Sequence, residues 1–205
     1  MIQKFLRDIY PSLLGFLTKL IYQRKNVSFK GNFKCDSIPK ILIDNDSNLR
    51  IGKDVIFRRN VEIRVHNKAE IFIHNNVKID RGVRLLSTNN SHIVLGEGVR
   101  IGLYSVFNGG DSIEIGSSTL ISGFVYVQTS MHGHKDKTSL IQKQGYFHSP
   151  IKIKNDCWLG AHSVVMPGVI LGRGVVVGSN AVVNKSFDSN LIIAGVPAKV
   201  LKERE

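Results

Sequence analysis

The sequence predicts an all-β fold: a left-handed parallel β-helix of hexapeptide repeats with a projecting loop, a short N-terminal helical segment and a short C-terminal tail. Aliphatic residues recur at every sixth position near the C-terminus, at Ile153, Leu159, Val165, Leu171, Val177 and Val183. Small or β-branched residues dominate four positions after each of them, at Cys157, Ser163, Val169, Val175 and Ala181. A period of six fits neither an α-helix nor a hairpin, whereas three six-residue sides close one triangular coil.

The same period continues upstream in triplets of inward-facing residues. These are Ile51, Phe57 and Ile63; Ile73, Ile79 and Leu85; Leu95, Ile101 and Phe107; and Ile115, Ile121 and Val127. Extra residues fall between the triplets, at the third corner of each coil. We expect stacked coils to pair their backbones in parallel ladders around a continuous aliphatic column.

One interval breaks the period. From Val127 to Ile153 the gap is 26 residues, where a regular side needs six. Because the excess falls at the corner that carries the smaller insertions, we expect residues 129–150 to form a loop that projects from the prism. The loop is polar and contains His132, His134 and His148.

The two ends follow other patterns, so we divide the chain into a helical segment at 1–25, the β-helix at 26–187, and a C-terminal strand and tail at 188–205. Apolar residues at helical spacing define the first segment: Ile2, Phe5, Leu6, Ile9, Leu13, Phe16, Leu17 and Leu20. Pro11 is expected to kink this helix or to start a second one. Two interpretations remain open. The helix caps the first coil or packs on a neighbouring subunit, or it binds peripherally to a membrane surface beside the basic residues Arg24 and Lys25.

Composition limits the partners and the compartment. The 205 residues carry a formal net charge of +12, which favours an anionic partner such as a membrane surface or a phosphorylated cofactor. The basic residues are scattered and no nucleic-acid motif occurs, so we expect no nucleic-acid partner. The 2 cysteines are too few for a disulfide framework and favour the reducing cytoplasm. No apolar run is long enough to predict a membrane span.

The stretches "WLGAHSVVMPGVILGRGVVVGSNAVVNKSF" and "IIAGVPAKVL" resemble the hexapeptide-repeat acyltransferases, and most of all their sugar O-acetyltransferase branch, which includes the galactoside and maltose acetyltransferases. The resemblance covers about residues 95–201, and it does not extend to the first 50 residues. It implies a homotrimer with active sites between subunits, and acetyl-CoA as co-substrate in the groove between neighbours.

The resemblance also implies a catalytic histidine at the start of the projecting loop. Counting forward from Gly116 places it at His132, and counting back from Trp158 places it at His134. The forward count crosses only regular coil, so we choose His132. His134, Asn108, Asp111 and Trp158 are then candidates for supporting or acceptor contacts. The cofactor positions implied by the family are Trp158, Gly160, Ala161, Gly178, Ser179, Asn184, Lys185, Lys199 and Lys202.

The chemistry expected of such a site is direct acetyl transfer in a ternary complex. A histidine general base would remove the proton of a saccharide hydroxyl, and a backbone N–H such as that of Gly133 could stabilise the oxyanion. A thioester is already activated, so no metal is required. The acceptor is expected to be a bacterial surface glycan or its precursor, which implies a cytoplasmic enzyme of polysaccharide biosynthesis. If the N-terminal helix binds lipid, the enzyme would lie at the inner face of the membrane.

Other functions remain open at this point. A sugar amine or an antibiotic could replace the hydroxyl acceptor. A metal enzyme like the γ-class carbonic anhydrases could bind zinc through His132, His134 and His162, and a non-catalytic β-helix scaffold would need no site at all. Cys157 falls at a small-residue corner, so we expect it to pack rather than to act as a nucleophile.

Overall fold

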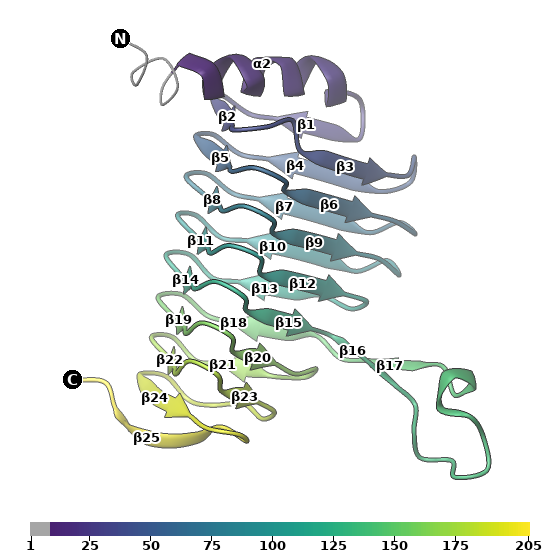
Figure 1. The fold of residues 1–205 in the computed structure, drawn as a ribbon, viewed down its shortest axis with the longest axis vertical. Coiled ribbons are helices and arrows are strands. Elements are labelled where there is room, and N and C mark those ends of the chain that lie inside the picture. The colour runs from purple at the N-terminus through teal and green to yellow at the C-terminus, as the bar shows by residue number, and fades with distance from the viewer. Residues whose placement is uncertain (1–8) are drawn as a thin grey trace.

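The structure is a computed structural model that describes residues 9–205, and these form a triangular prism of stacked coils (Figure 1). The chain passes in turn through three parallel sheets within this range, here called A, B and C. Sheet A holds β1 (Val27–Phe29), β4 (Asn48–Ile51), β7 (Glu70–Ile73), β10 (His92–Leu95), β13 (Ile113–Ile115), β18 (Ile151–Ile153) and β21 (Ile170–Leu171). The predicted parallel β-helix is therefore confirmed.

The other two faces repeat the arrangement. Sheet B holds β2 (Phe33–Cys35), β5 (Val55–Phe57), β8 (Lys78–Ile79), β11 (Arg100–Ile101), β14 (Leu120–Ile121), β19 (Trp158–Leu159), β22 (Val176–Val177), β24 (Leu191–Ala194) and β25 (Lys199–Glu203). Sheet C holds β3 (Lys40–Ile43), β6 (Glu62–Val65), β9 (Arg84–Ser87), β12 (Val106–Gly109), β15 (Tyr126–Gln128), β20 (Val164–Val165) and β23 (Val182–Val183).

The hexapeptide positions line up as the period predicts. In sheet C, Phe107 pairs with Leu85 on one side and with Val127 on the other, and Val127 pairs with Val165. All four side chains are 0% exposed. Each coil thus adds one layer to an aliphatic column that runs through the prism, and burial of this column supplies the main driving force for folding.

The extra residues of each coil lie at the corner between sheets C and A. Asn67–Lys68 and Asn89–Asn90 turn there with φ between 57° and 61°, the left-handed region that asparagine tolerates better than most residues. The projecting loop leaves the prism at the same corner, between β15 and β18, and we call it the arm (Figure 1).

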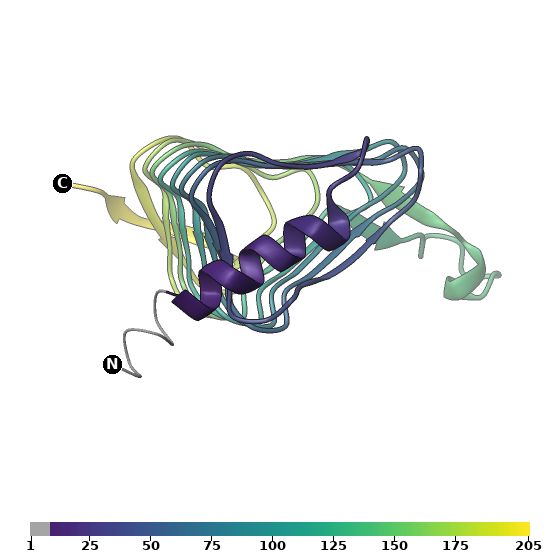
Figure 2. The same cartoon turned by 90° about the horizontal axis from the view of Figure 1, so that it is seen from above.

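Helix α2 (Tyr10–Tyr22) has Pro11 in its first turn, where a missing N–H costs nothing. The helix lies across the N-terminal end of the prism (Figure 2). Pro11, Gly15 and Thr18 are its buried residues, and a Cβ on Gly15 would lie 1.9 Å from the carbonyl oxygen of Phe33. Only glycine permits so close a contact, so small residues, and not the predicted apolar residues, make the packed face.

The predicted apolar face of α2 points away from the coils. Its members within the described range are 37% to 65% exposed: Ile9, Leu13, Phe16, Leu17 and Leu20. Ile2, Phe5 and Leu6 lie outside the described residues. No helix in residues 9–205 is long and apolar enough to span a bilayer.

At the other end of the prism, β24 pairs in parallel with β22, and β25 returns antiparallel to β24. The C-terminal strand thus extends sheet B by one layer, while the final residues form an exposed strand on its outer side.

Candidate functional site

The root of the arm is a two-stranded antiparallel ribbon. β16 (Ser130–His132) pairs with β17 (Tyr146–His148), with His132 opposite Tyr146 and Ser130 opposite His148. The His132 and Tyr146 rings lie 4.0 Å apart between centroids, tilted by 35°. The exposed His132 side chain is therefore held against an aromatic ring on a paired strand rather than on a free loop.

The backbone next to His132 corrects one expectation. The Gly133 N–H donates to the Gly145 carbonyl at 3.0 Å, so it closes the ribbon and does not point to an oxyanion position. The His134 ring approaches the His132 carbonyl, with 3.0 Å between Nδ1 and that oxygen. His134 thus contacts the backbone of His132 and is exposed, which fits a supporting position.

The distal part of the arm is fixed by its own polar groups. The Asp136 carboxylate accepts hydrogen bonds from the Thr138 hydroxyl at 2.7 Å, the Thr138 N–H at 2.8 Å and the Ser139 hydroxyl at 2.8 Å. These bonds, the Thr138 hydroxyl foremost, lower the pKa of Asp136 to about 2. The carboxylate thus stays ionised, and its hydrogen bonds intact, down to about that pH. Gln144 then ties the two sides of the loop together, because its amide donates to the Asp136 and Ser139 carbonyls.

Two acceptor candidates lie directly beside the arm root. Thr129, the last residue before β16, donates its N–H to the Asn108 carbonyl at 3.1 Å, and its hydroxyl accepts from the Asp111 N–H at 2.9 Å. A Cβ on Gly110 would lie 2.2 Å from the Ser130 hydroxyl oxygen and 2.7 Å from His148 Nδ1. The structure therefore brings Asn108 and Asp111 to the corner from which His132 projects.

The Ser130–His148 pair was missed by sequence reasoning. The Ser130 hydroxyl lies 2.8 Å from His148 Nδ1, and this pair closes the base of the ribbon against Gly110. His148 stands three residues before the next inward aliphatic, Ile151, as Ser130 stands three residues after Val127. This equal spacing on both sides of the loop could have indicated that the two residues lie opposite each other.

The first cofactor candidates gather on the corner between sheets B and C. Trp158 is on β19, 51% exposed, and its indole N–H donates to the Ser122 hydroxyl at 3.1 Å. Ala161 accepts a hydrogen bond from the Asn180 N–H at 2.9 Å. Gly160, Ala161, Gly178 and Ser179 consequently lie in adjacent coils on one corner.

The two glycines of this group also have a purely structural reason. A Cβ on Gly160 would lie 2.5 Å from the Ser179 nitrogen, and one on Gly178 would lie 2.8 Å from the Ala194 Cβ. Both positions need glycine for the coils to stack, with or without a bound cofactor.

The remaining cofactor candidates are more dispersed. Asn184 and Lys185 follow β23 at the corner between sheets C and A, with the Lys185 ammonium 5.5 Å from the centre of the Phe187 ring. Lys199 and Lys202 lie on the exposed strand β25, and the Lys202 ammonium is 3.8 Å from a Glu205 carboxylate oxygen. These lysines all lie in the last coils of the prism.

Within one chain the catalytic candidate does not meet the cofactor candidates on β19 and on the corner between sheets B and C, whereas Asn184 and Lys185 lie at the arm's own corner but in later coils. The arm projects from the corner between sheets C and A, whereas Trp158 lies on sheet B, on the other side of the prism (Figure 1). The three histidines of the alternative zinc site are also apart, because His162 stacks on Phe124 and not on the arm. Within residues 9–205, no group of three or more His, Cys, Asp or Glu side chains is arranged to bind a metal ion.

An aromatic column on the corner between sheets B and C was not anticipated. Tyr104, Phe124 and His162 stack in successive coils, with ring centroids 5.5 Å and 4.8 Å apart. Their φ values of 54° to 59° are left-handed, which is strained for bulky side chains. They share a position with Asn60 and Gly82 in the coils above, and this recurrence could have revealed the column from the sequence.

Both cysteines are buried in the core, and for Cys157 this agrees with the expected packing role. Burial raises the pKa of the Cys157 thiol, and its sulfur donates to the Gly172 carbonyl at 3.1 Å. A neutral, buried thiol is a poor nucleophile, so Cys157 takes no part in the candidate site.

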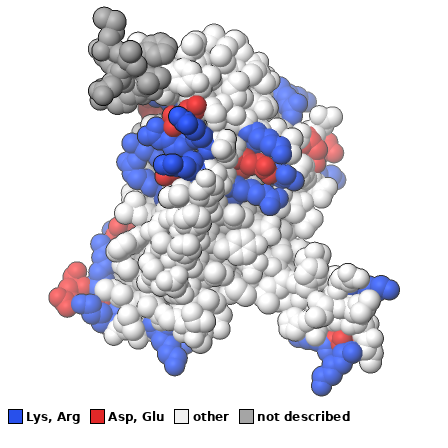
Figure 3. All heavy atoms as spheres, in the orientation of Figure 1, with Lys and Arg blue, Asp and Glu red and all other residues white. Residues whose placement is uncertain are grey.

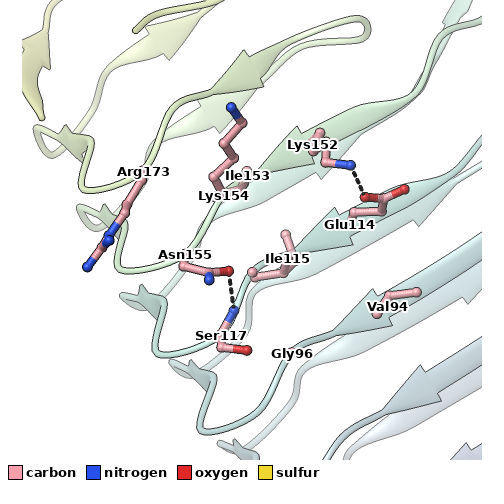
Figure 4. A pocket seen from close by; sticks show the side chains of 11 residues that line it. Val94, Gly96, Glu114, Ile115, Ser117, Lys152, Ile153, Lys154, Asn155 and Arg173 are labelled. Carbon is pink, nitrogen blue, oxygen red and sulfur yellow. Dashed lines mark hydrogen bonds and ion pairs between the residues drawn. The ribbon is translucent and has the colours of Figure 1, made fainter. Parts of the chain in front are cut away.

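An open hollow of about 550 Å³ lies on sheet A, where none of the predicted site residues lines it (Figure 4). Lys152 and Glu114 form an ion pair of 2.6 Å across it, which lowers the pKa of Glu114. Figure 3 shows charged side chains over the upper coils, at the arm and at the lower left, near the C-terminal end of the chain. The upper group includes Arg58 with Asp36 and, on sheet C, Glu62 with Arg64. The upper group lies apart from the candidate site, whereas the arm also carries His132 and β25 carries Lys199 and Lys202.

Comparison with known proteins links this geometry to a family. Residues 150–185 match the family described as bacterial transferase hexapeptide (six repeats). The chain is 33% identical over 171 residues to the provisionally named lipopolysaccharide biosynthesis O-acetyl transferase WbbJ of Escherichia coli (strain K12), covering 76% of this chain and 87% of that one.

Two solved structures extend the comparison. AntD, an N-acyltransferase from Bacillus cereus in complex with dTDP and 3-hydroxybutyryl-CoA, superposes with a TM-score of 0.63 at 27% identity, covering 76% of this chain and 82% of that one. Galactoside acetyltransferase in complex with coenzyme A gives a TM-score of 0.54 at 26% identity, covering 63% of this chain and 66% of that one.

Proposed function

The chain belongs to the hexapeptide-repeat acyltransferases, and on that premise we propose that it transfers the acetyl group of acetyl-CoA to a hydroxyl group of a saccharide. The proposal rests mainly on the structure of the arm root. The only long interruption of the hexapeptide period within residues 9–205 forms a paired ribbon that holds His132 against Tyr146, beside Asn108 and Asp111. A non-catalytic β-helix would not need a paired ribbon that holds a histidine in this way.

In the proposed reaction the His132 imidazole accepts the proton of the acceptor hydroxyl while its oxygen attacks the thioester carbonyl. The carbonyl becomes a tetrahedral oxyanion, and its collapse breaks the carbon–sulfur bond. The leaving thiolate takes the proton from the imidazolium, so the products are an acetyl ester and CoA thiol. His132 returns to its initial state, and the reaction requires neither a metal nor a covalent enzyme intermediate.

We propose that each active site is shared by two copies of a homotrimer. Trp158 and the adjacent corner residues lie across the prism from the arm, so His132 of one copy would act beside Trp158 of the next. Closed cyclic symmetry repeats this contact three times in a trimer. We place the reaction in the cytoplasm, because both cysteines are free thiols and the proposed donor is a cytoplasmic metabolite.

Mixing two inactive variants tests this shared site. His132→Ala removes the base and Trp158→Ala removes the opposite wall, so each homotrimer should be nearly inactive. Co-expression should restore about a quarter of wild-type turnover, because random assembly pairs an intact His132 with an intact Trp158 at that fraction of the interfaces. Acetyl-CoA consumption with a glycan acceptor measures the recovery.

The control is a mixture of the two variants purified separately and kept from exchanging subunits, which should stay inactive. If the co-expressed trimers are also inactive while each variant folds and assembles, the base and the wall serve the same chain and the proposed arrangement is wrong.

The lysines of the last coils are proposed to meet the phosphates of the donor. We expect Lys199→Glu with Lys202→Glu to raise the KM for acetyl-CoA and to make it less sensitive to salt, because a pair of favourable charges becomes repulsive. Steady-state kinetics at two ionic strengths measure both effects. Lys137→Glu, on the exposed arm, is the matched control. An unchanged KM would return Lys199 and Lys202 to the role of solvated surface residues.

A sugar amine is the second candidate acceptor, favoured by the likeness to AntD, which is named as an N-acyltransferase. The names of WbbJ and galactoside acetyltransferase support the hydroxyl instead. A panel of matched sugars and amino sugars separates the two, because an ester product is cleaved by mild hydroxylamine and an amide is not.

A further inference from the structure

The outward face of α2 carries a continuous apolar surface, which we call the apolar stripe: Ile9, Leu13, Phe16, Leu17, Leu20 and Ile21. These six side chains are between 37% and 65% exposed. Their spacing places them on one side of the helix, and the surface over α2 is largely white in Figure 3, without charged groups in that view. Contiguous apolar surface of this kind marks an interaction site more often than an accident of folding.

Packing of the helix on its own chain does not explain the apolar stripe. The opposite side of α2 makes that contact, through Pro11, Gly15 and Thr18. Thr18 lies 3.3 Å from the Cys35 sulfur, and the Tyr22 hydroxyl donates to the Pro39 carbonyl at 3.1 Å. The helix is therefore anchored by small and polar residues together with the partly buried Leu14 and Tyr22, and the six side chains of the apolar stripe are left for another partner.

The orientation of the apolar stripe limits what that partner can be. Helix α2 lies flat across the end of the prism, so the stripe faces outward from that end, along the direction in which the coils stack (Figures 1 and 2). Contacts between neighbouring prisms in the proposed trimer would use the sides of the coils, where the arm and Trp158 lie. Three apolar stripes would then face one plane.

The charges around α2 favour an anionic plane. Lys19 and Arg24 donate to the carbonyl oxygens of Gly31 and Ile43, and neither forms an ion pair with a carboxylate of residues 9–205. Lys25 and Lys30 are exposed and form no ion pair with any residue of the described range. An apolar helix face bordered by unneutralised cations is the composition of interfacial helices that bind acidic lipid.

We propose that the apolar stripe binds the surface of a membrane rich in anionic phospholipid, with α2 parallel to the bilayer plane. The apolar side chains would enter the acyl boundary, while Lys25 and Lys30 would meet lipid phosphates. The prism would then stand upright on the membrane, with its C-terminal coils facing away from it. This placement is independent of the transfer reaction, and it uses none of the residues assigned to that reaction.

Vesicle co-sedimentation of the full chain tests the proposal. Wild type should sediment with vesicles of phosphatidylcholine and phosphatidylglycerol, and far less with phosphatidylcholine alone. Phe16→Glu with Leu20→Glu should lower the partition coefficient at least tenfold, roughly the effect of losing one buried apolar side chain. Leu140→Glu with Ile141→Glu is the matched control, since these arm residues are 60% and 59% exposed, and it should leave binding unchanged.

A second variant tests the charges separately from the stripe. Lys25→Glu with Lys30→Glu should weaken binding to the mixed vesicles by roughly fivefold per residue and leave the weak binding to phosphatidylcholine unchanged. Circular dichroism and thermal unfolding establish that each variant is folded, without reference to activity.

Equal sedimentation of wild type and the apolar-stripe variant would overturn the proposal. So would light scattering that shows wild type joined end to end and the stripe variant as single trimers, with no vesicle binding by either. In that case the apolar stripe is a contact between copies of this chain.

Discussion

His132→Ala is expected to lower turnover by roughly 10²–10⁴-fold, the usual cost of removing a general base. The side chain is exposed on β16 and lies against the Tyr146 ring, outside the aliphatic column, so the fold should survive the change. The KM for acetyl-CoA should stay close to that of wild type, because the substitution leaves all the proposed cofactor residues unchanged. Steady-state kinetics and analytical ultracentrifugation check the three parts of this expectation.

His134→Ala is the internal control for that experiment. Its ring contacts the His132 carbonyl, so its loss should cost less turnover and act mainly on acceptor binding. A collapse of turnover in His134→Ala together with normal turnover in His132→Ala would show that the base was assigned to the wrong histidine.

Phe107→Ala is expected to lower the free energy of unfolding by about 3–5 kcal/mol. The ring is 0% exposed and lies between Leu85 and Val127 in the column, so its removal leaves a cavity that the stacked coils cannot close. Denaturant titration at one fixed protein concentration measures the change, since the stability of an oligomer depends on concentration.

Lys78→Ala provides the matched control, because this side chain is exposed on β8 and should change stability by no more than about 0.5 kcal/mol. A loss at Phe107 no larger than the loss at Lys78 would mean that the aliphatic column is not what holds the coils together.

The inward half of the molecule could be predicted from the sequence because its constraint is periodic. Leu95, Ile101 and Phe107 repeat at six-residue spacing, and a triangular coil with six-residue sides buries all three. The arm followed from the same period, as the one interval too long to be a side of the triangle. The side of α2 that packs could not be predicted, since a small residue such as Gly15 carries no apolar signal and only its distance to Phe33 shows its role.

The candidate site was predictable to a smaller extent, for a physical reason. Asn108 and Asp111 come near His132 through backbone bonds to Thr129, and these depend on the shape of a corner that no period describes. The hydrogen bond from the Gly133 N–H to the Gly145 carbonyl could not be predicted either, because it depends on how the two strands of the ribbon pair. Outward positions such as Tyr104 and Phe124 are weakly constrained by folding, so their recurring place in successive coils, and not their residue type, indicates that they are neighbours.

The reversal of the chain at β25 has a consequence for solubility. A stack of parallel coils has two open ends, and unpaired strand edges there could recruit another molecule and start a fibre. Antiparallel β25 occupies the free side of β24, and α2 lies across the first coil. The last strands of the other two sheets, β21 and β23, are only 2 residues long and offer little template. The two ends of the prism are thus covered, so neither end readily adds the coils of another molecule, and the protein is kept from polymerising end to end.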